Sequence, residues 1–277
     1  MISSIIGDMI GSIYEFNNDL SPDCCFMKDN IFTDDTVLTV ATADVLLNRK
    51  DYAQTYLAYT REYPHRGYGS MFIEAANSGI LKPYNSYGNG SMMRVGPIGW
   101  VFSDIRDTIK EAIKSANVSH NHIEGKKGAA AIAYAMLMLR RGEKKEVIKK
   151  ILESKPFYYD LSVKMKDFPK TFDVTCQGTL PRCMAIFFET NSFEEAMLEG
   201  LKMGGDVDTN CCIVGSLCDA SYGLPKRALI ESVYERIPLK MANIVTAFTK
   251  QYIDKTFIEP TKIGTEYLSV KQALSKS

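Results

Sequence analysis

Apolar residues recur along this chain with a spacing of about 3.6, the period of a helix that packs one face against a core. Residues 37–47 are apolar on nearly every face, so we expect a buried helix there, and residues 90–102 are apolar as well. Residues 124–141 include GAAAIAYAMLML, one of the strongest helix-forming stretches of the chain, and segments such as 104–115 and 144–152 are amphipathic. Together the pattern predicts helices over residues 37–47, 52–61, 70–77, 90–102, 104–115, 124–141, 144–152, 177–189, 192–203, 209–222, 226–235, 239–252 and 266–275.

Strand signals are scarce in this sequence. Strict alternation of apolar and polar residues is rare, and the segments between the predicted helices are rich in Gly, Asp, Asn and Pro. Pro97 falls inside the predicted helix 90–102, where it either kinks the helix or lies near its start. Residues 154–175 are the least regular and are expected to form an insertion or a loop beside a substrate. The pattern predicts an all-α fold and a single domain spanning residues 1–277.

The composition is that of an ordinary globular protein. The 277 residues are 45% hydrophobic and 24% charged, with zero formal net charge, so nucleic-acid binding is not indicated. None of the seven cysteines has CxxC spacing, and the adjacent pairs Cys24-Cys25 and Cys211-Cys212 favour free thiols in a reducing compartment. Neither a secretory leader nor an uncharged run of transmembrane length is present, so we expect a cytoplasmic protein without a membrane partner.

A polar cluster, Thr33-Asp34-Asp35-Thr36, opens the first apolar helix. Consecutive side chains on a regular helix point about 100° apart, so the first three residues converge on one ion only if they precede the helix. Under this interpretation Thr36 is the expected N-cap. The alternative is that the cluster only caps the helix, through Thr36 or Asp35.

A second cluster has the same order of parts. Gly204 and Gly205 precede Asp206, Asp208 and Thr209, and a buried helix follows. The two clusters offer four carboxylates and two hydroxyls, which are hard oxygen ligands that suit Mg²⁺ or Mn²⁺ rather than zinc. Four carboxylates held together repel one another, which favours two divalent ions over one.

Two further polar stretches lie at the edges of apolar segments. In the first, Asp8 is a candidate N-cap for a helix over residues 9–16, and Glu15 by itself would be a surface residue. The second is SYGNGSMMR (86–94), where small residues at the head of a helix expose backbone N–H groups to an anion such as phosphate, or form a plain turn. It is not a P-loop, because no Lys-Ser or Lys-Thr follows the glycines.

Five stretches, in order, resemble the motifs of the ADP-ribosylglycohydrolase family, which includes the dinitrogenase-reductase-activating glycohydrolases and the ADP-ribosyl-acceptor hydrolases. They are GDMIGSIYE (7–15), FTDDT (32–36), SYGNGSMMRVGPIG (86–99), SHNHIEGKKGA (119–129) and GGDVDTNCCIVGSLCDASYG (204–223). Each is weak alone, and the ordered set is specific. The departures, Ile123 in place of a common Pro and Cys211, Cys212 and Cys218 in place of Ala, touch no ligand position.

This resemblance implies an orthogonal all-α domain with two Mg²⁺ ions, or Mn²⁺, in a central cleft. By motif, the metal ligands would be Thr33, Asp34, Asp35, Asp206, Asp208 and Thr209. Glu15 and Asp35 would be catalytic, by positioning or deprotonating a water molecule. The substrate contacts would be Asp34, Ser86, Tyr87, Gly88, Asn89, Gly90, Ser91 and His120.

The implied reaction is Mg²⁺-dependent hydrolysis of the glycosidic bond between ADP-ribose and an acceptor, which is a modified protein side chain or a small conjugate. Two alternatives stay open: a non-catalytic ADP-ribose-binding protein on the same fold, and a metal-dependent nucleotide phosphohydrolase. The acceptor is not specified by the sequence, although loops 63–70 and 154–175 are expected to influence it. We expect a monomer.

Overall fold

The structure is a computed structural model that describes residues 1–15, 21–23 and 26–254. Its regular elements are all helical, and the only β pairing in these residues is an isolated bridge between Gly88 and Thr175. The elements are α1 (Ile2–Gly11), α2 (Asp34–Asn48), α3 (Tyr52–Glu62), α4 (Ser70–Ser78), α5 (Gly90–Met93), α6 (Gly96–Val101), α7 (Ile105–Asn117), α8 (Ile123–Arg140), α9 (Lys145–Glu153), η1 (Met165–Asp167), α10 (Cys176–Glu189), α11 (Phe193–Met203), α12 (Val207–Tyr222), α13 (Arg227–Arg236), α14 (Leu239–Phe248) and η2 (Thr249–Ile253).

The all-α prediction is confirmed, and most predicted helices match an observed helix to within one to three residues at each end. The predicted helix 9–16 is wrong, because α1 runs from Ile2 to Gly11 and Asp8 lies inside it. The helix predicted to run to residue 252 is α-helical only to Phe248 and continues as the π-helix η2. The predicted helix 266–275 and the pair Cys24-Cys25 lie outside the described residues.

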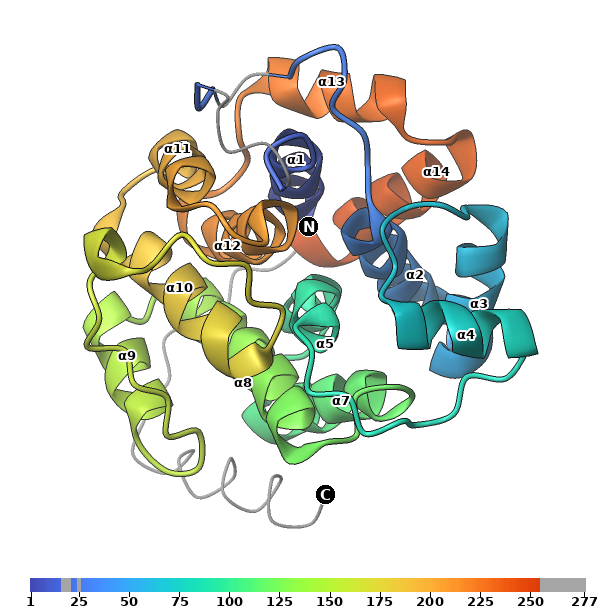
Figure 1. The fold of residues 1–277 in the computed structure, drawn as a ribbon, viewed down its shortest axis with the longest axis horizontal. Coiled ribbons are helices and arrows are strands. Elements are labelled where there is room, and N and C mark those ends of the chain that lie inside the picture. The colour runs from blue at the N-terminus through green and yellow to red at the C-terminus, as the bar shows by residue number, and fades with distance from the viewer. Residues whose placement is uncertain (16–20, 24–25, 255–277) are drawn as a thin grey trace.

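Helices α1 and α12 lie side by side near the middle of the molecule (Figure 1). Their backbones approach so closely that only glycine fits at the contact. A Cβ atom on Gly7 would lie 2.2 Å from the carbonyl oxygen of Cys211, and one on Gly11 would lie 2.6 Å from the Cα of Asp208. This contact brings a polar residue of α1, Asp8, beside the first turn of α12.

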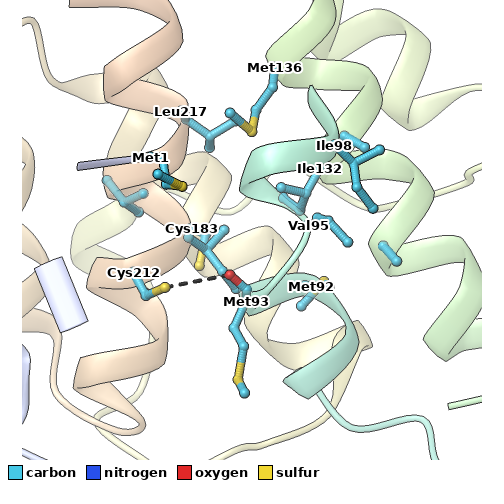
Figure 2. Packing of buried hydrophobic residues seen from close by; sticks show 14 of the residues in the cluster. Met1, Met92, Met93, Val95, Ile98, Ile132, Met136, Cys183, Cys212 and Leu217 are labelled. Carbon is cyan, nitrogen blue, oxygen red and sulfur yellow. Dashed lines mark hydrogen bonds between the residues drawn. The ribbon is translucent and has the colours of Figure 1, made fainter. Parts of the chain in front are cut away.

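The apolar stretch 90–102 forms two short helices, α5 and α6, instead of the single predicted helix. Pro97 lies in the first turn of α6 and has no N–H to donate to the carbonyl of Met93, four residues earlier. That carbonyl instead accepts from the Thr39 hydroxyl at 3.2 Å and from the Cys212 thiol at 3.5 Å. Figure 2 shows the Cys212 contact within the apolar core, which anchors α5 to α12, while Thr39 anchors it to α2.

The core is mainly apolar, and buried polar residues such as Ser3, Asp8 and Arg94 lie within it. Residues 129–139 of α8 are all buried, and five of the seven cysteines lie in the described residues as free, buried thiols (Cys176, Cys183, Cys211, Cys212 and Cys218). Across the described part of the chain, none of the helices is both long enough and apolar enough to cross a membrane.

Candidate active site

The first predicted cluster forms the N-terminus of α2. The N-cap is Thr33, whose hydroxyl accepts from the backbone N–H of Asp35 at 3.2 Å, so the prediction of Thr36 as the cap is wrong. The N–H of Asp34 donates to the carbonyl of Arg66 at 2.7 Å, which satisfies another free donor of the first turn. Asp34 and Asp35 therefore belong to the first turn of α2. Because no earlier helical turn precedes this one, both side chains can extend beyond the N-terminal end of the helix.

Asp8 completes this end of α2, a role that the sequence did not suggest. Its carboxylate accepts from the backbone N–H and hydroxyl of Thr33 at 3.0 and 2.7 Å, and from the N–H of Thr36 at 3.1 Å. The Thr36 hydroxyl donates to it as well. Asp8 is fully buried, and burial raises its pKa above the ordinary value, although the four hydrogen bonds from Thr33 and Thr36 oppose that shift.

The second cluster forms the start of α12 and meets the first. Gly204 and Gly205 adopt φ of 70° and 79°, as expected for the flexible approach to the helix. The Thr209 hydroxyl donates to Asp35 at 3.1 Å across the interface of α2 and α12. Two segments that are 174 residues apart in sequence thus share one polar site.

Two overlapping sets of carboxylates could hold metal ions. Asp8, Asp35 and Asp208 form one set and Glu15, Asp206 and Asp208 the other, and in each set one oxygen per residue lies within 4.8 Å of the others. One oxygen of Asp35, Oδ1, is buried and has no hydrogen-bond partner among the described residues. A buried, unpartnered carboxylate oxygen beside other carboxylates is what a hard cation requires. Asp208 belongs to both sets and is therefore the central candidate ligand.

Burial and mutual repulsion dominate the electrostatics of these carboxylates. Burial, reinforced by Asp208 and Asp8, raises the pKa of Asp35 and of Asp34 well above the ordinary value. Burial also raises the pKa of Asp208, and it raises the pKa of Glu15 to about 8 and that of Asp206 to about 6. Without cations the cluster cannot carry its full negative charge near neutral pH.

This electrostatic strain predicts how the stability of the metal-free protein depends on pH. Above pH 7 the unfolded carboxylates have lost their protons, whereas folded groups with raised pKa still hold some, so the unfolding free energy should fall as pH rises from 7 to 9. Below pH 7 the lowered pKa of His120 opposes this trend. Thermal unfolding in EDTA should show a melting temperature that decreases across this window.

Saturating Mg²⁺ provides the control for the pH experiment. A bound cation stabilises the ionised carboxylates, so the decrease should be much smaller with Mg²⁺ than with EDTA. A metal-free melting temperature that is constant or rises between pH 7 and 9 would contradict the assignment of uncompensated charge to this cluster.

A cavity of about 450 Å³ opens over the carboxylates. Glu15, Asp34, Asp35, Asp206, Asp208 and Thr209 line one side of it. The stretch 86–94 contributes further lining residues. So do the two segments expected to influence the acceptor, through residues 67–72 and through Phe172 and Val174 at the end of the irregular stretch 154–175. The metal candidates and the candidate anion loop therefore face the same space.

The loop 86–94 divides into residues that face the cavity and residues that support the loop. Ser86, Gly88, Asn89 and Gly90 are on the cavity wall, whereas Tyr87 and Ser91 are not among the lining residues. The Ser91 hydroxyl points to the carbonyl of Gly125 at 2.9 Å. The predicted substrate contacts at these positions stay predictions, and the geometry favours the first four.

Asn89 has a role that its motif did not indicate. Its side-chain amide donates to Asp206 at 2.5 Å and to the Thr179 hydroxyl at 3.0 Å, and its backbone N–H donates to the carbonyl of Val174 at 2.7 Å. Asn89 therefore ties the loop directly to a candidate metal ligand. Hydrogen bonds of this kind orient a ligand carboxylate and adjust its affinity for the metal.

His120 reaches the cavity from the turn between α7 and α8 and is nearly buried. Its neighbour His122 instead caps α8, accepting from the N–H of Glu124 at 3.2 Å. The third histidine, His65, is not among the lining residues.

Sequence patterns missed two residues of the site, Asp8 and Arg94. Asp8 looked like a cap because its partners, Thr33 and Thr36, are far along the chain. Arg94 followed the glycines without a recognisable role, yet it is fully buried on the cavity wall. The one available signal for Asp8 was its place between Gly7 and Gly11, whose spacing of four residues is typical of a close helix contact.

An all-helical fold in which buried oxygen ligands face a glycine-rich loop defines a candidate metal-dependent enzyme. The family model ADP-ribosylglycohydrolase matches residues 1–252, and the chain belongs to this family. It is 23% identical to ADP-ribosylhydrolase ARH3 of Mus musculus over 307 aligned positions, which cover 81% of this chain and 83% of that protein. It is also 23% identical to the Homo sapiens protein of the same name, with 81% and 84% covered.

A solved structure shares the fold. It is described as an ADP-ribosylglycohydrolase-related protein complex and superposes with a TM-score of 0.64 at 19% sequence identity, covering 90% of this chain and 96% of the other. At that identity the likeness concerns the fold alone. The family resemblance in the five sequence motifs is confirmed, and the roles of the individual site residues stay predictions.

Proposed function

We propose that this protein hydrolyses the glycosidic bond between ADP-ribose and an acceptor in a Mg²⁺-dependent reaction that releases ADP-ribose. The acceptor is a modified protein side chain or a small ADP-ribosyl conjugate. The observation that carries the proposal is that both carboxylate clusters and the 86–90 loop line a single cavity, in a chain of the ADP-ribosylglycohydrolase family. In this proposal the carboxylates would hold the metal beside the bond that breaks, and the loop would hold the diphosphate at a fixed distance from it.

The acidic side of the cavity fits two divalent cations. Asp8, Asp35 and Asp208 would hold one ion, and Glu15, Asp206 and Asp208 the other. When bound, such ions supply Lewis-acid stabilisation of ribose oxygens and of a water molecule. Compared with the ligands expected from the sequence motifs, these sets add Asp8 and Glu15 and leave out Asp34.

The two predicted catalytic carboxylates differ in their surroundings. Asp35 is buried, and its Oδ2 accepts from the Thr209 hydroxyl at 3.1 Å, which holds the carboxylate against α12. Glu15 is half-buried on the cavity wall, follows the end of α1 and has a pKa raised to about 8. Its place on the open cavity wall makes Glu15 the candidate for activating a water molecule once bound cations keep its carboxylate ionised, and the enclosed Asp35 the candidate for orienting that water.

The loop side of the cavity fits the diphosphate of ADP-ribose. Gly88 and Gly90 are partly exposed on the cavity wall, and Asn89 holds the loop against Asp206. Binding the diphosphate here would place the distal ribose over the carboxylates. Energy from this remote contact would then orient the bond that breaks, so that C1″ faces the activated water.

The test is a panel of defined ADP-ribosyl conjugates, with the modification on arginine, serine, a nucleic-acid base or an acetyl group, incubated with and without Mg²⁺. At least one conjugate should release free ADP-ribose with Mg²⁺, and EDTA should abolish the release. Formation of AMP and ribose phosphate would identify a phosphohydrolase instead. Tight binding of ADP-ribose without turnover of any conjugate would identify a binding protein.

A further inference from the structure

Cys176 is the first residue of α10 and holds the loop 86–90 from behind. It is fully buried and is not among the residues that line the cavity. Its backbone N–H donates to the carbonyl of Tyr87 at 2.9 Å, and its thiol donates to the carbonyl of Gly88 at 3.1 Å. The N–H contact also satisfies one of the free donors in the first turn of α10. One residue therefore holds two consecutive carbonyl groups of the loop.

The Gly88 carbonyl depends on this thiol for its hydrogen bond. No backbone N–H in the described part of the chain donates to it. The Ser91 hydroxyl lies 3.3 Å from the Gly88 carbonyl but 2.9 Å from that of Gly125, and its single hydrogen favours the shorter contact. The thiol of Cys176 is thus left as the donor to Gly88.

The peptide that joins Gly88 to Asn89 is held on both sides. Its N–H, which belongs to Asn89, donates to the carbonyl of Val174 at 2.7 Å. The C=O and N–H of a trans peptide point in opposite directions, so Cys176 and Val174 hold opposite edges of one plane. Glycine rotates more freely than other residues, so this peptide would turn more easily if the contact from Cys176 were lost.

The orientation of this peptide decides where the Asn89 side chain points. That side chain donates to Asp206 at 2.5 Å and to the Thr179 hydroxyl at 3.0 Å. Asp206 belongs to one of the two candidate metal sets. A ligand carboxylate that accepts from a fixed donor is held in the direction of the cation, and loss of such a donor lowers metal affinity. A continuous series of contacts therefore runs from the thiol, through the loop backbone, to a candidate metal ligand.

Two features keep the thiol available as a donor. Burial raises the pKa of Cys176 to about 12, so the thiol keeps its hydrogen at neutral pH. Helix α8 leaves space for the sulfur, because a Cβ atom on Gly128 would lie only 2.9 Å from Sγ of Cys176. The thiol is therefore both protonated and accommodated beside the loop.

We propose that Cys176 is a positioning residue for the candidate metal site. By donating its thiol hydrogen to Gly88 it fixes the peptide that carries Asn89, and Asn89 in turn orients Asp206 toward a divalent cation. The proposal rests on the metal part of the proposed function. It assigns to Cys176 an effect on cation binding, although the hydrogen bonds of the thiol go to Gly88 and Ser91 and not to a candidate ligand.

The hydrogen bond is tested by the infrared S–H stretching band, whose frequency falls when a thiol donates. The spectrum of the full chain minus that of Cys176→Ser isolates the band of Cys176. The same subtraction with Cys218→Ser gives a reference, because Cys218 is an equally buried thiol to which none of the described residues offers a hydrogen-bond acceptor. The Cys176 band should lie at the lower frequency of the two, and equal frequencies would overturn the proposal.

Calorimetric titration with Mg²⁺ measures the effect on cation binding. Cys176→Ala removes the donor and should raise the dissociation constant for Mg²⁺ about fivefold to tenfold. Cys176→Ser restores a donor at the same position and should recover most of the wild-type affinity. Cys218→Ala makes the same chemical change elsewhere in the core and should leave the dissociation constant unchanged. Equal effects of the two alanine variants would mean that Cys176 only fills space.

A double-mutant cycle tests the route through Asn89. Asn89→Ala alone should raise the dissociation constant for Mg²⁺ by about 10- to 100-fold. If the thiol acts through Asn89, adding Cys176→Ala to Asn89→Ala should have little further effect. A further rise as large as that of Cys176→Ala in the wild type would overturn the proposed route. If Cys176→Ala does not fold, the infrared comparison with Cys176→Ser still decides the hydrogen bond.

The outcome for Cys176 is separable from that for the proposed function. If the wild type binds Mg²⁺ but releases ADP-ribose from no conjugate, the proposed reaction fails, and the cycle still decides the role of Cys176. If the wild type binds Mg²⁺ and Cys176→Ala behaves like Cys218→Ala, only the role of Cys176 is wrong. If the wild type binds no divalent cation, the metal part of the proposed function and the role of Cys176 in it are both wrong.

Discussion

Replacing Asp208 with asparagine is expected to lower the release of ADP-ribose at saturating Mg²⁺ by more than about 100-fold, because Asp208 belongs to both candidate metal sets. Asparagine keeps the shape and one oxygen but removes the charge that attracts the cations. Any rate should be measured with the conjugate that the panel identifies as a substrate, over a range of Mg²⁺ concentrations.

The same substitution is expected to stabilise the protein when no metal is present. Burial and the neighbouring carboxylates Asp206 and Asp8 raise the pKa of Asp208, so its charge opposes folding at neutral pH. In EDTA, Asp208→Asn should therefore melt at a higher temperature than wild type, and added Mg²⁺ should raise its melting temperature less. Asp167→Asn, which makes the same chemical change at an exposed position, should alter neither activity nor stability. Wild-type activity in Asp208→Asn would refute the metal assignment.

Replacing Asp8 with alanine is expected to have the opposite effect on stability. The carboxylate of Asp8 accepts four hydrogen bonds from Thr33 and Thr36, so its removal leaves buried donors at the start of α2 without partners. Each unsatisfied buried group is unfavourable by about 1–3 kcal/mol, so the unfolding free energy should fall by about 3 kcal/mol or more. Urea denaturation in EDTA measures this change.

Two further variants separate the causes. Thr36→Val removes one donor of the Asp8 network and should lower the unfolding free energy by about 1 kcal/mol. Asp8→Asn retains an acceptor oxygen and should fall between wild type and Asp8→Ala. If Asp8→Ala were instead more stable than wild type in EDTA, as expected for Asp208→Asn, then repulsion among the carboxylates would outweigh the hydrogen bonds at Asp8.

The fold was largely predictable from the sequence because helix periodicity is a local property. The failures concern places where a distant contact decides the local structure. The carbonyl of Met93 is satisfied by Thr39 and Cys212, which permits the helix to break before Pro97. Similarly, the α12 contact and not a capping signal determines where α1 lies, so Asp8 was misinterpreted.

In the candidate site, too, residues that are close in sequence could be predicted, whereas roles that depend on partners far along the chain could not. Asp34, Asp35, Asp206 and Asp208 could be singled out because their clusters are contiguous in sequence, and all four line the same cavity. The sequence analysis required Asp34 and Asp35 to precede the helix in order to meet at one site. In the structure both residues are the first residues of α2, directly after the N-cap Thr33, and both line the cavity. The supporting role of Asn89 depends on a partner 117 residues away, which no local pattern reveals.

The contact between α1 and α12 has a consequence for folding. One candidate metal set takes Asp8 from the first helix, Asp35 from the second and Asp208 from near the end of the described chain. No partially folded form that leaves α1 undocked contains this set, so cations that use it bind only the fully assembled chain. The free energy of cation binding would then stabilise the native state but no partially folded state, which would make folding more cooperative.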